Sequence, residues 1–244
     1  MIKDKFGTFG ANAGSYSKFR QGFPNEVFDW LKELVGDKKE VLDLGCGTGI
    51  ATRQLAELGF RVTGVDLDER MIKEAQNTGG GINYVISLVN QLPFTAGQFE
   101  IITAFSAFHW FCDKDSIKEI WRVLAPDGLL FIVNKNDKSQ MRKMIRDLIK
   151  KEVKQNLPSK PETYDPKRIL EENEFNNVHE KVFEVIEYYS LEEAIGNTQT
   201  MSIWNLVPSG EKGRILIKIK DKLSAEFDNQ VPREIEIKAV AGLK

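Results

Sequence analysis

The sequence of 244 residues predicts an α/β protein with a doubly wound, mostly parallel sheet. Short apolar runs of strand length alternate with segments whose apolar residues recur at helical spacing, a pattern typical of a parallel sheet covered by helices on both faces. Three glycines, Gly45, Gly47 and Gly49, directly follow the first of these runs. The chain is also long enough to bury a full core as one domain.

The first half of the chain contains five predicted strands separated by helices and turns. A helix begins at Pro24, where proline is best tolerated, and ends at Gly36. The remaining elements follow in this order: strand Val41–Leu44, the glycine turn, a helix with Ala51, Leu55 and Leu58 on one face, strand Arg61–Asp66, helix Met71–Gln76, a turn at Gly79–Gly81, strand Ile82–Val89, strand Phe99–Phe105, a helix with Ile117, Ile120, Trp121 and Leu124 on one face, a turn at Ala125–Gly128 and strand Leu129–Val133.

The second half is less regular. We predict an amphipathic helix with Met141, Ile145, Leu148 and Ile149 on one face, a loop at Pro158–Pro166, a sixth strand at Val182–Tyr189, a helix at Glu211–Phe227 and a last strand at Glu234–Val240. The whole chain, residues 1–244, is then one domain, and residues 1–23 and 137–180 are the candidates for a small helical cap.

Composition narrows the classes of protein to consider. With 34 basic and 36 acidic residues the net charge is −2, which gives no electrostatic footprint for nucleic acid. Two cysteines, Cys46 and Cys112, give no disulfide framework, the first residues form no hydrophobic signal segment, and the longest apolar runs are too short to span a membrane. We therefore expect a cytoplasmic protein with no membrane or nucleic-acid partner and no metal site.

The glycine turn predicts a nucleotide cofactor. Glycines without side chains let backbone N–H groups approach a ligand closely. A dinucleotide fingerprint would place its third glycine one position later, where this chain has Ile50. Asp43, just before the glycines, suits a ligand with a positive charge there. S-adenosylmethionine, which carries an ammonium and a sulfonium, fits that requirement better than a pyrophosphate.

A second acid completes the predicted cofactor site. Asp66 ends the next strand, 17 residues after Gly49, where a carboxylate can accept hydrogen bonds from both ribose hydroxyls. Asp68 competes for the same role. Leu67, between them, lies either against the adenine or in the core.

Five blocks of sequence carry a resemblance to a known family. In chain order they are Asp43–Gly49, Asp66, Leu92–Phe94, Phe99–Phe111 and Arg122–Gly128. Together they resemble the class I S-adenosylmethionine-dependent methyltransferases. The resemblance implies a seven-stranded sheet in which the last strand lies antiparallel between the fifth and sixth. Ser106–Phe111 is most similar to the trans-aconitate methyltransferase-like branch, which acts on small molecules.

The same resemblance implies further cofactor contacts. Tyr16 and Arg20 match a segment that folds over the cofactor in many of these enzymes, and Arg20 would then pair with the methionine carboxylate; otherwise it is a solvated arginine. Many members carry an acid for the adenine amine where this chain has Leu88. Val89, through its backbone N–H, and Asn90 remain as candidates for adenine, and Phe105 as a further cofactor contact.

The chemistry is expected at the carboxyl end of the fourth strand, where open α/β sheets bind their ligands. His109 is one of only two histidines, and it either has a structural role, orients a substrate oxygen or acts as a general base. Trp110, Phe111 and Trp204 belong either to the core or to an aromatic substrate pocket.

These observations lead to a functional expectation. The chain is expected to be an enzyme that transfers a methyl group from S-adenosylmethionine to a small molecule, a carboxylic acid or a carrier-bound acid. The alternatives are a quinone or ring-precursor methyltransferase and a non-catalytic regulatory module that binds S-adenosylmethionine.

Overall fold

The structure is a computed structural model that describes residue 10, residues 13–153 and residues 164–244. The described residues fall into two compact units. Unit 1 lies within residues 1–20, 136–162 and 184–236, and unit 2 lies within residues 21–135, 163–183 and 237–244.

The bounds of unit 1 differ from those of the cap candidates. Unit 1 takes in residues 184–236, whereas the part of the 137–180 candidate that follows residue 162 belongs to unit 2. Sequence periodicity indicates the type of an element, but it carries no information about which elements pack together. The single-domain interpretation stays a prediction.

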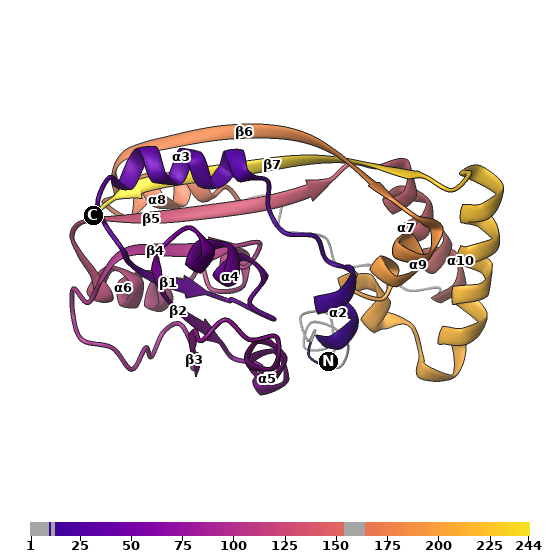
Figure 1. Cartoon of the computed structure of the whole chain (residues 1–244), viewed down its shortest axis with the longest axis horizontal. Helices are drawn as coiled ribbons and strands as arrows, with labels where there is room; N and C mark the ends of the chain where they lie inside the picture. Colours follow the sequence, from indigo (N-terminus) through magenta and orange to yellow (C-terminus); the bar gives the residue numbers. More distant parts are fainter. Residues whose placement is uncertain (1–9, 11–12, 154–163) are drawn as a thin grey trace. The chain divides into compact units, whose positions relative to one another are not determined.

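One seven-stranded sheet, with six parallel strands and one antiparallel strand, runs through the described part of the chain (Figure 1). The strand order is β3-β2-β1-β4-β5-β7-β6, so the last strand, β7, lies between β5 and β6. The predicted fold class is confirmed. The strands are β1 Glu40–Leu44, β2 Arg61–Asp66, β3 Asn83–Ile86, β4 Phe99–Phe105, β5 Leu124–Asp137, β6 Asn176–Tyr189 and β7 Val231–Leu243.

Unit 2 has its core around the central strands. Leu42 and Leu44 of β1, Ile102 of β4 and Ile132 of β5 are fully buried, as expected of parallel strands covered on both faces. The described helices of this unit are α3 Asn25–Val35, α4 Ile50–Glu57, α5 Glu69–Asn77, the 3₁₀ helix η2 Phe108–Trp110, α6 Lys114–Val123 and α8 Pro166–Glu172.

Strands β3 and β5 differ from their predicted bounds. β3 ends at Ile86, and Ser87 instead stabilises a turn in which its Oγ donates a hydrogen bond to the Gln91 carbonyl at 2.9 Å. The predicted turn at Ala125–Gly128 is a bulge inside the single strand β5, with Asp127 at a φ of +56°. Turn residues thus redirect β5 without ending it.

Unit 1 is mainly helical among its described residues. Its described helices are α2 Ala13–Phe19, α7 Gln140–Val153, α9 Leu191–Thr198, η3 Ser202–Leu206, η4 Ser209–Glu211 and α10 Lys212–Glu226. Ile145 of α7 and Ile219 of α10 lie in its buried core. Of the predicted loop at Pro158–Pro166, residues 158–163 lie outside the described residues, and Pro166 begins α8.

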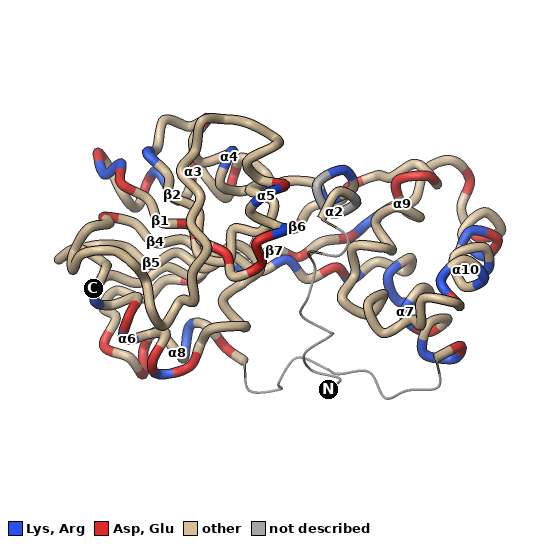
Figure 2. Tube along the Cα trace, turned by 90° about the horizontal axis from the view of Figure 1, so that it is seen from below, with Lys and Arg blue, Asp and Glu red and all other residues tan. Residues whose placement is uncertain are grey.

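Both signs of charge are present on the helices of unit 1. Figure 2 shows Lys and Arg together with Asp and Glu on α7 and α10. Glu152 of α7, for example, pairs with Arg214 at 2.6 Å and with Lys218 at 2.7 Å. Across the ranges that the structure describes, no helix combines the length and the apolar character needed to cross a membrane.

Candidate active site

The glycine turn joins β1 to α4 in a conformation that demands glycine. Gly45, Gly47 and Gly49 have φ angles of +67°, +55° and +75°, a region that L side chains rarely adopt. A Cβ placed on Gly45 would lie 2.4 Å from the Cβ of Ala107, so the turn packs directly against the segment that follows β4. The turn and the carboxyl end of β4 therefore lie next to each other, and their joint role in one site stays a prediction.

Asp43 lies in β1, two residues before this turn. Its side chain is buried, and its two carboxylate oxygens accept hydrogen bonds from Thr52 Oγ1 at 2.7 Å and Thr103 Oγ1 at 2.8 Å. Burial raises the pKa of the carboxyl to about 6; the two hydroxyls partly offset this rise, and the charge of Asp66 adds to it. Asp43 thus links β1 to α4 and to β4, and its contact with a cofactor ammonium stays a prediction.

Asp66 and Asp68 hold different groups. Asp66 Oδ2 accepts a hydrogen bond from the backbone N–H of Gly47 at 2.8 Å, which places this half-buried carboxylate against the glycine turn. Burial raises its pKa. Asp68 caps α5 by accepting a hydrogen bond from Arg70 N at 3.0 Å, and it also pairs with the Arg70 guanidinium. The arrangement favours Asp66 for the ribose role.

Exposed apolar side chains lie at the carboxyl ends of β2 and β3. Leu67 after β2, Ile86 at the end of β3 and Leu88 beyond it are 62%, 50% and 46% exposed. Val89 is half-buried and Asn90 is exposed. Large exposed apolar side chains at the carboxyl ends of adjacent strands suit a flat heterocycle such as adenine. Ile86 was not among the predicted residues, because sequence cannot show that β3 is an edge strand.

A strained residue marks the carboxyl end of β4. Ser106 has a φ of +56° although it is not glycine, and its N–H donates to the Val133 carbonyl at 2.6 Å. Non-glycine residues in this region are often found at functional sites. The chain then enters η2, which carries His109 and Trp110. Phe111 follows and packs edge-on against Phe108, with ring centroids 5.8 Å apart.

Tyr164 and Asn134 were not among the predicted site residues, but Tyr164 lies beside His109 and contacts Asn134. The half-buried His109 ring lies 4.7 Å from Trp110 and 5.8 Å from Tyr164, measured between centroids. The Tyr164 hydroxyl donates to Asn134 Oδ1 at 3.3 Å, and burial raises the pKa of Tyr164 well above its usual value. Asn134 Nδ2 is buried without a hydrogen-bond partner among the described residues. The available signal was a polar residue, Asn134, directly after the apolar run of the fifth strand.

Of three further predicted site residues, Phe105 and Trp204 are buried and Trp110 is exposed. Phe105 is buried in an aromatic cluster, with ring centroids 4.8 Å from Phe23 and 5.6 Å from Phe28. Trp110 is 49% exposed. Trp204 is buried in the core of unit 1, a position that favours the core interpretation over the pocket.

Tyr16 and Arg20, which match the segment that folds over the cofactor in related enzymes, belong to unit 1. Arg20 donates hydrogen bonds from Nε to Thr200 Oγ1 at 2.9 Å and from Nη2 to the Thr200 carbonyl at 3.1 Å. Tyr16 is part of α2, but its side chain lies outside the described residues. Their predicted contacts with the cofactor stay predictions.

The turn also has unused polar capacity. Thr48 Oγ1 is buried within it and has no hydrogen-bond partner in the described part of the chain. These features fit an adenosine-containing cofactor with a charged tail: the Thr48 hydroxyl without a partner, the glycine turn, the Asp66 carboxylate and the exposed leucines.

Comparisons with known proteins agree with this geometry. Residues 42–132 match the family described as a methyltransferase domain. An uncharacterized methyltransferase of Mycobacterium tuberculosis is 32% identical over 126 residues, which cover 52% of this chain and 51% of that protein. The malonyl-[acyl-carrier protein] O-methyltransferase of Enterobacter lignolyticus is 35% identical over 92 residues, which cover 37% and 36%. The chain thus spans about half the length, or less, of these curated relatives.

Solved structures extend the likeness over most of the chain. A protein proposed to be a type II methyltransferase, from Anaeromyxobacter dehalogenans, aligns with a TM-score of 0.67 and 21% identity over 92% of this chain and 97% of that one. The fold is that of the class I methyltransferases. Phosphoethanolamine N-methyltransferase 2 from Haemonchus contortus, solved in complex with S-adenosyl-L-methionine, aligns with a TM-score of 0.57 and 17% identity over 100% and 60% of the two chains.

Proposed function

We propose that this protein transfers a methyl group from S-adenosylmethionine to a small-molecule acceptor, a carboxylic acid or a carrier-bound acid. The observation that carries the proposal is the contact between the Asp66 carboxylate and the Gly47 N–H, because it brings the ribose acid and the glycine turn together in one site. The methyltransferase domain match over residues 42–132 supports the reaction class.

The residues of unit 2 have distinct roles in this proposal. Backbone N–H groups of the glycine turn face the methionine end, Asp66 accepts hydrogen bonds from the ribose hydroxyls, and Leu67 and Leu88 cover the adenine. The cofactor, when bound, supplies a methyl group on a positively charged sulfur. Positioning acceptor and methyl carbon in line can lower the barrier by about 7 to 11 kcal/mol.

The proposed acceptor class determines what His109 has to do. A carboxylate is already ionised at neutral pH and needs no base. Aromatic side chains such as Trp110 and Phe111 would strip water from it, which favours a reaction in which opposite charges neutralise each other. His109, against Tyr164, would then orient the acceptor. The relative that acts on malonyl-[acyl-carrier protein] supports an acid.

Methyl-labelled S-adenosylmethionine tests the reaction and the acceptor together. The purified chain is incubated with three acceptors: a free carboxylic acid, an acid bound to acyl-carrier protein and a quinol. Transfer to an acid gives a methyl ester, from which alkali releases the label, whereas methylation of a ring gives an alkali-stable product. Stable label on the quinol alone would replace the acid with a ring precursor. Tight cofactor binding with no label on any acceptor would favour the regulatory module.

His109→Asn separates orientation from general-base catalysis. For an acid acceptor we expect kcat to stay within about tenfold of wild type, because no proton has to be removed. Loss of about 10²-fold or more, together with loss of the acidic limb of the kcat profile and intact cofactor binding, would make His109 the base and contradict the acid assignment.

A further inference from the structure

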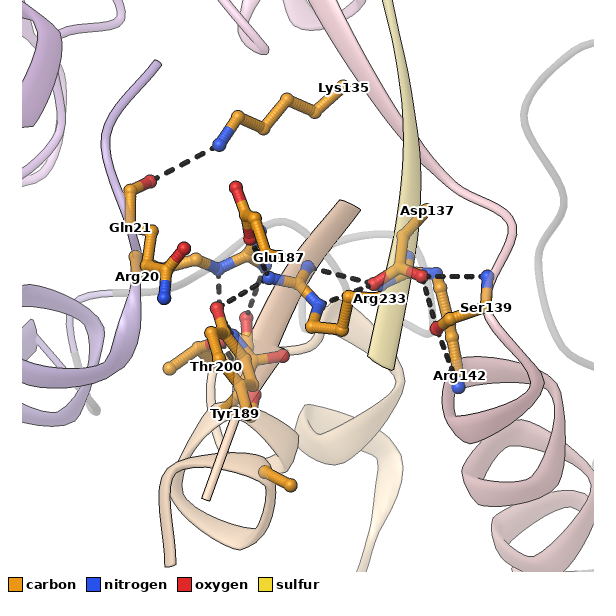
Figure 3. Close-up of polar contacts among 12 residues, drawn as sticks. Arg20, Gln21, Lys135, Asp137, Ser139, Arg142, Glu187, Tyr189, Thr200 and Arg233 are labelled. Atoms are coloured by element: carbon orange, nitrogen blue, oxygen red, sulfur yellow. Dashed lines mark hydrogen bonds and ion pairs between the residues drawn. The ribbon is translucent and has the colours of Figure 1, made fainter. Parts of the chain in front are cut away.

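Unit 1 contains a group of buried charged side chains that the proposed reaction does not use. Figure 3 shows Arg233 of β7 between Asp137 of β5 and Glu187 of β6. Arg233 donates to Asp137 Oδ2 from Nη2 at 2.8 Å and from Nε at 3.0 Å, and its Nη1 donates to Glu187 Oε2 at 2.6 Å. All three side chains are almost fully buried, so these pairs are shielded from water and salt.

Among the described residues of this cluster, the arginines outnumber the acids. Arg142, in the first turn of α7, interacts electrostatically with Asp137 but also with Arg20, Arg146 and Arg233. Arg233 already holds the Asp137 carboxylate. Among the residues that the structure describes, the Arg142 guanidinium makes no hydrogen bond; the only bond of this residue in Figure 3 is from its backbone N–H to Ser139 Oγ.

Arg142 is half-buried, and a guanidinium there without an acceptor among the described residues is costly. Burial lowers the pKa of Arg142 to about 10; Asp137 partly offsets this drop, and the neighbouring arginines add to it. At neutral pH the group nevertheless stays charged, and its five N–H donors form a planar fork that matches an oxyanion. A bound anion would supply both the missing negative charge and the missing acceptors.

We propose that unit 1 binds a small molecule bearing a carboxylate or phosphate group at Arg142, with Arg20 and Arg146 beside it. Arg142 supplies a bidentate pair, and the two flanking guanidiniums add charge. Arg20 keeps its hydrogen bonds to Thr200, which fix its side chain within the cluster. The site goes beyond the proposed methyl transfer and depends only on unit 1.

Thermal melts of the whole protein test this site. Citrate and inorganic phosphate are titrated separately against chloride at constant ionic strength. We expect a saturable rise in Tm, and the anion that acts at lower concentration identifies the ligand as a carboxylate or a phosphate. Arg142→Gln should weaken the response at least about tenfold. Lys143→Gln, which removes the same charge from the next, exposed position of α7, should leave it unchanged.

The melts without added anion separate recognition from a purely structural role. Arg142→Gln should melt at or above the wild-type temperature in chloride, because it removes repulsion among guanidiniums. A clear loss of stability in chloride would mean that Arg142 is a structural partner of Asp137 and would overturn the proposal. If this variant fails to fold, Arg142→Lys, which keeps the charge but loses the fork, should still weaken the anion response.

Two further results would contradict the site. One is a wild-type Tm that follows neither anion in a saturable way, and the other is an equal loss of response in Lys143→Gln. S-adenosylhomocysteine is titrated in parallel on the wild type. Stabilisation by this cofactor product without any anion response would overturn only the anion site, whereas the reverse result would overturn only the proposed function.

Discussion

At the scale of single residues, Asp66 and Asp68 provide a matched pair of carboxylates two positions apart. Asp66→Ala should weaken S-adenosylhomocysteine binding by about 2 kcal/mol or more, because hydrogen bonds to a charged acceptor are lost. Asp68→Ala should leave affinity unchanged but lower stability by about 1 kcal/mol, because Asp68 caps α5. Titration calorimetry and chemical denaturation measure the two effects. The opposite pattern of affinities would move the ribose acceptor to Asp68.

Asp43 gives a prediction about pH. Its pKa is raised to about 6 in the folded state, above the ordinary value of 3.8, so between these values the folded protein binds a proton more tightly than the unfolded chain. The free energy of unfolding should therefore fall as pH rises from about 4 to about 6, by up to about 3 kcal/mol from this group. Asp43→Asn should remove this dependence. If denaturation gives the same change in unfolding free energy with pH for the wild type and for Asp43→Asn, the assignment is contradicted.

Sequence predicted some site residues better than others. The position of Asp66 at the end of β2 was predicted, because a strand and a glycine turn fix its place along the chain. Tyr164 and Asn134 were not, because their contact joins residues 30 positions apart in sequence through tertiary packing. Asp43 was correctly placed near the end of its strand, but its hydrogen bonds with Thr52 and Thr103 join three elements, which no local pattern singles out.

At the scale of elements, the glycine turn must stay close to the segment after β4. Gly45→Ala should disturb both, because the new Cβ would lie 2.4 Å from the Cβ of Ala107 in a backbone conformation with positive φ. We expect cofactor binding to be lost and stability to fall by more than the roughly 1–2 kcal/mol cost of positive φ alone.

Gly36→Ala is the control for that substitution. Gly36 has a φ of +57°, but a Cβ there would meet open space, so only the backbone cost should appear. Thermal melts with and without S-adenosylhomocysteine compare the two variants. Equal destabilisation and intact cofactor binding in both would show that the turn tolerates separation from β4.

The regular elements were predictable where one periodicity dominates. β2 and β4 have their predicted bounds, because each is an uninterrupted run with a turn at its end. β5 was predicted to begin at Leu129, yet pairing of Leu124 with Phe99 extends it back across Pro126 and Gly128. A partner strand thus outweighed local turn propensity, which a sequence cannot show by itself.

At the scale of the whole molecule, sheet order was the strongest success of the family resemblance. The position of β7 between β5 and β6 is not encoded in any local pattern, and only the resemblance implied it. The composition of unit 1 was harder to predict. Its helices draw on three separate stretches of sequence, and the capping box of Ser190 and Glu193 that begins α9 went unrecognised.

The central claim is that the glycine turn and Asp66 bind S-adenosylmethionine, and ligand-dependent stability of the whole chain tests it most directly. At 100 times its dissociation constant, S-adenosylmethionine or S-adenosylhomocysteine should stabilise the fold by about 2.7 kcal/mol and raise Tm, and NAD at the same concentration should have no effect. Equal stabilisation by NAD, or no shift with either S-adenosyl compound, would contradict the account.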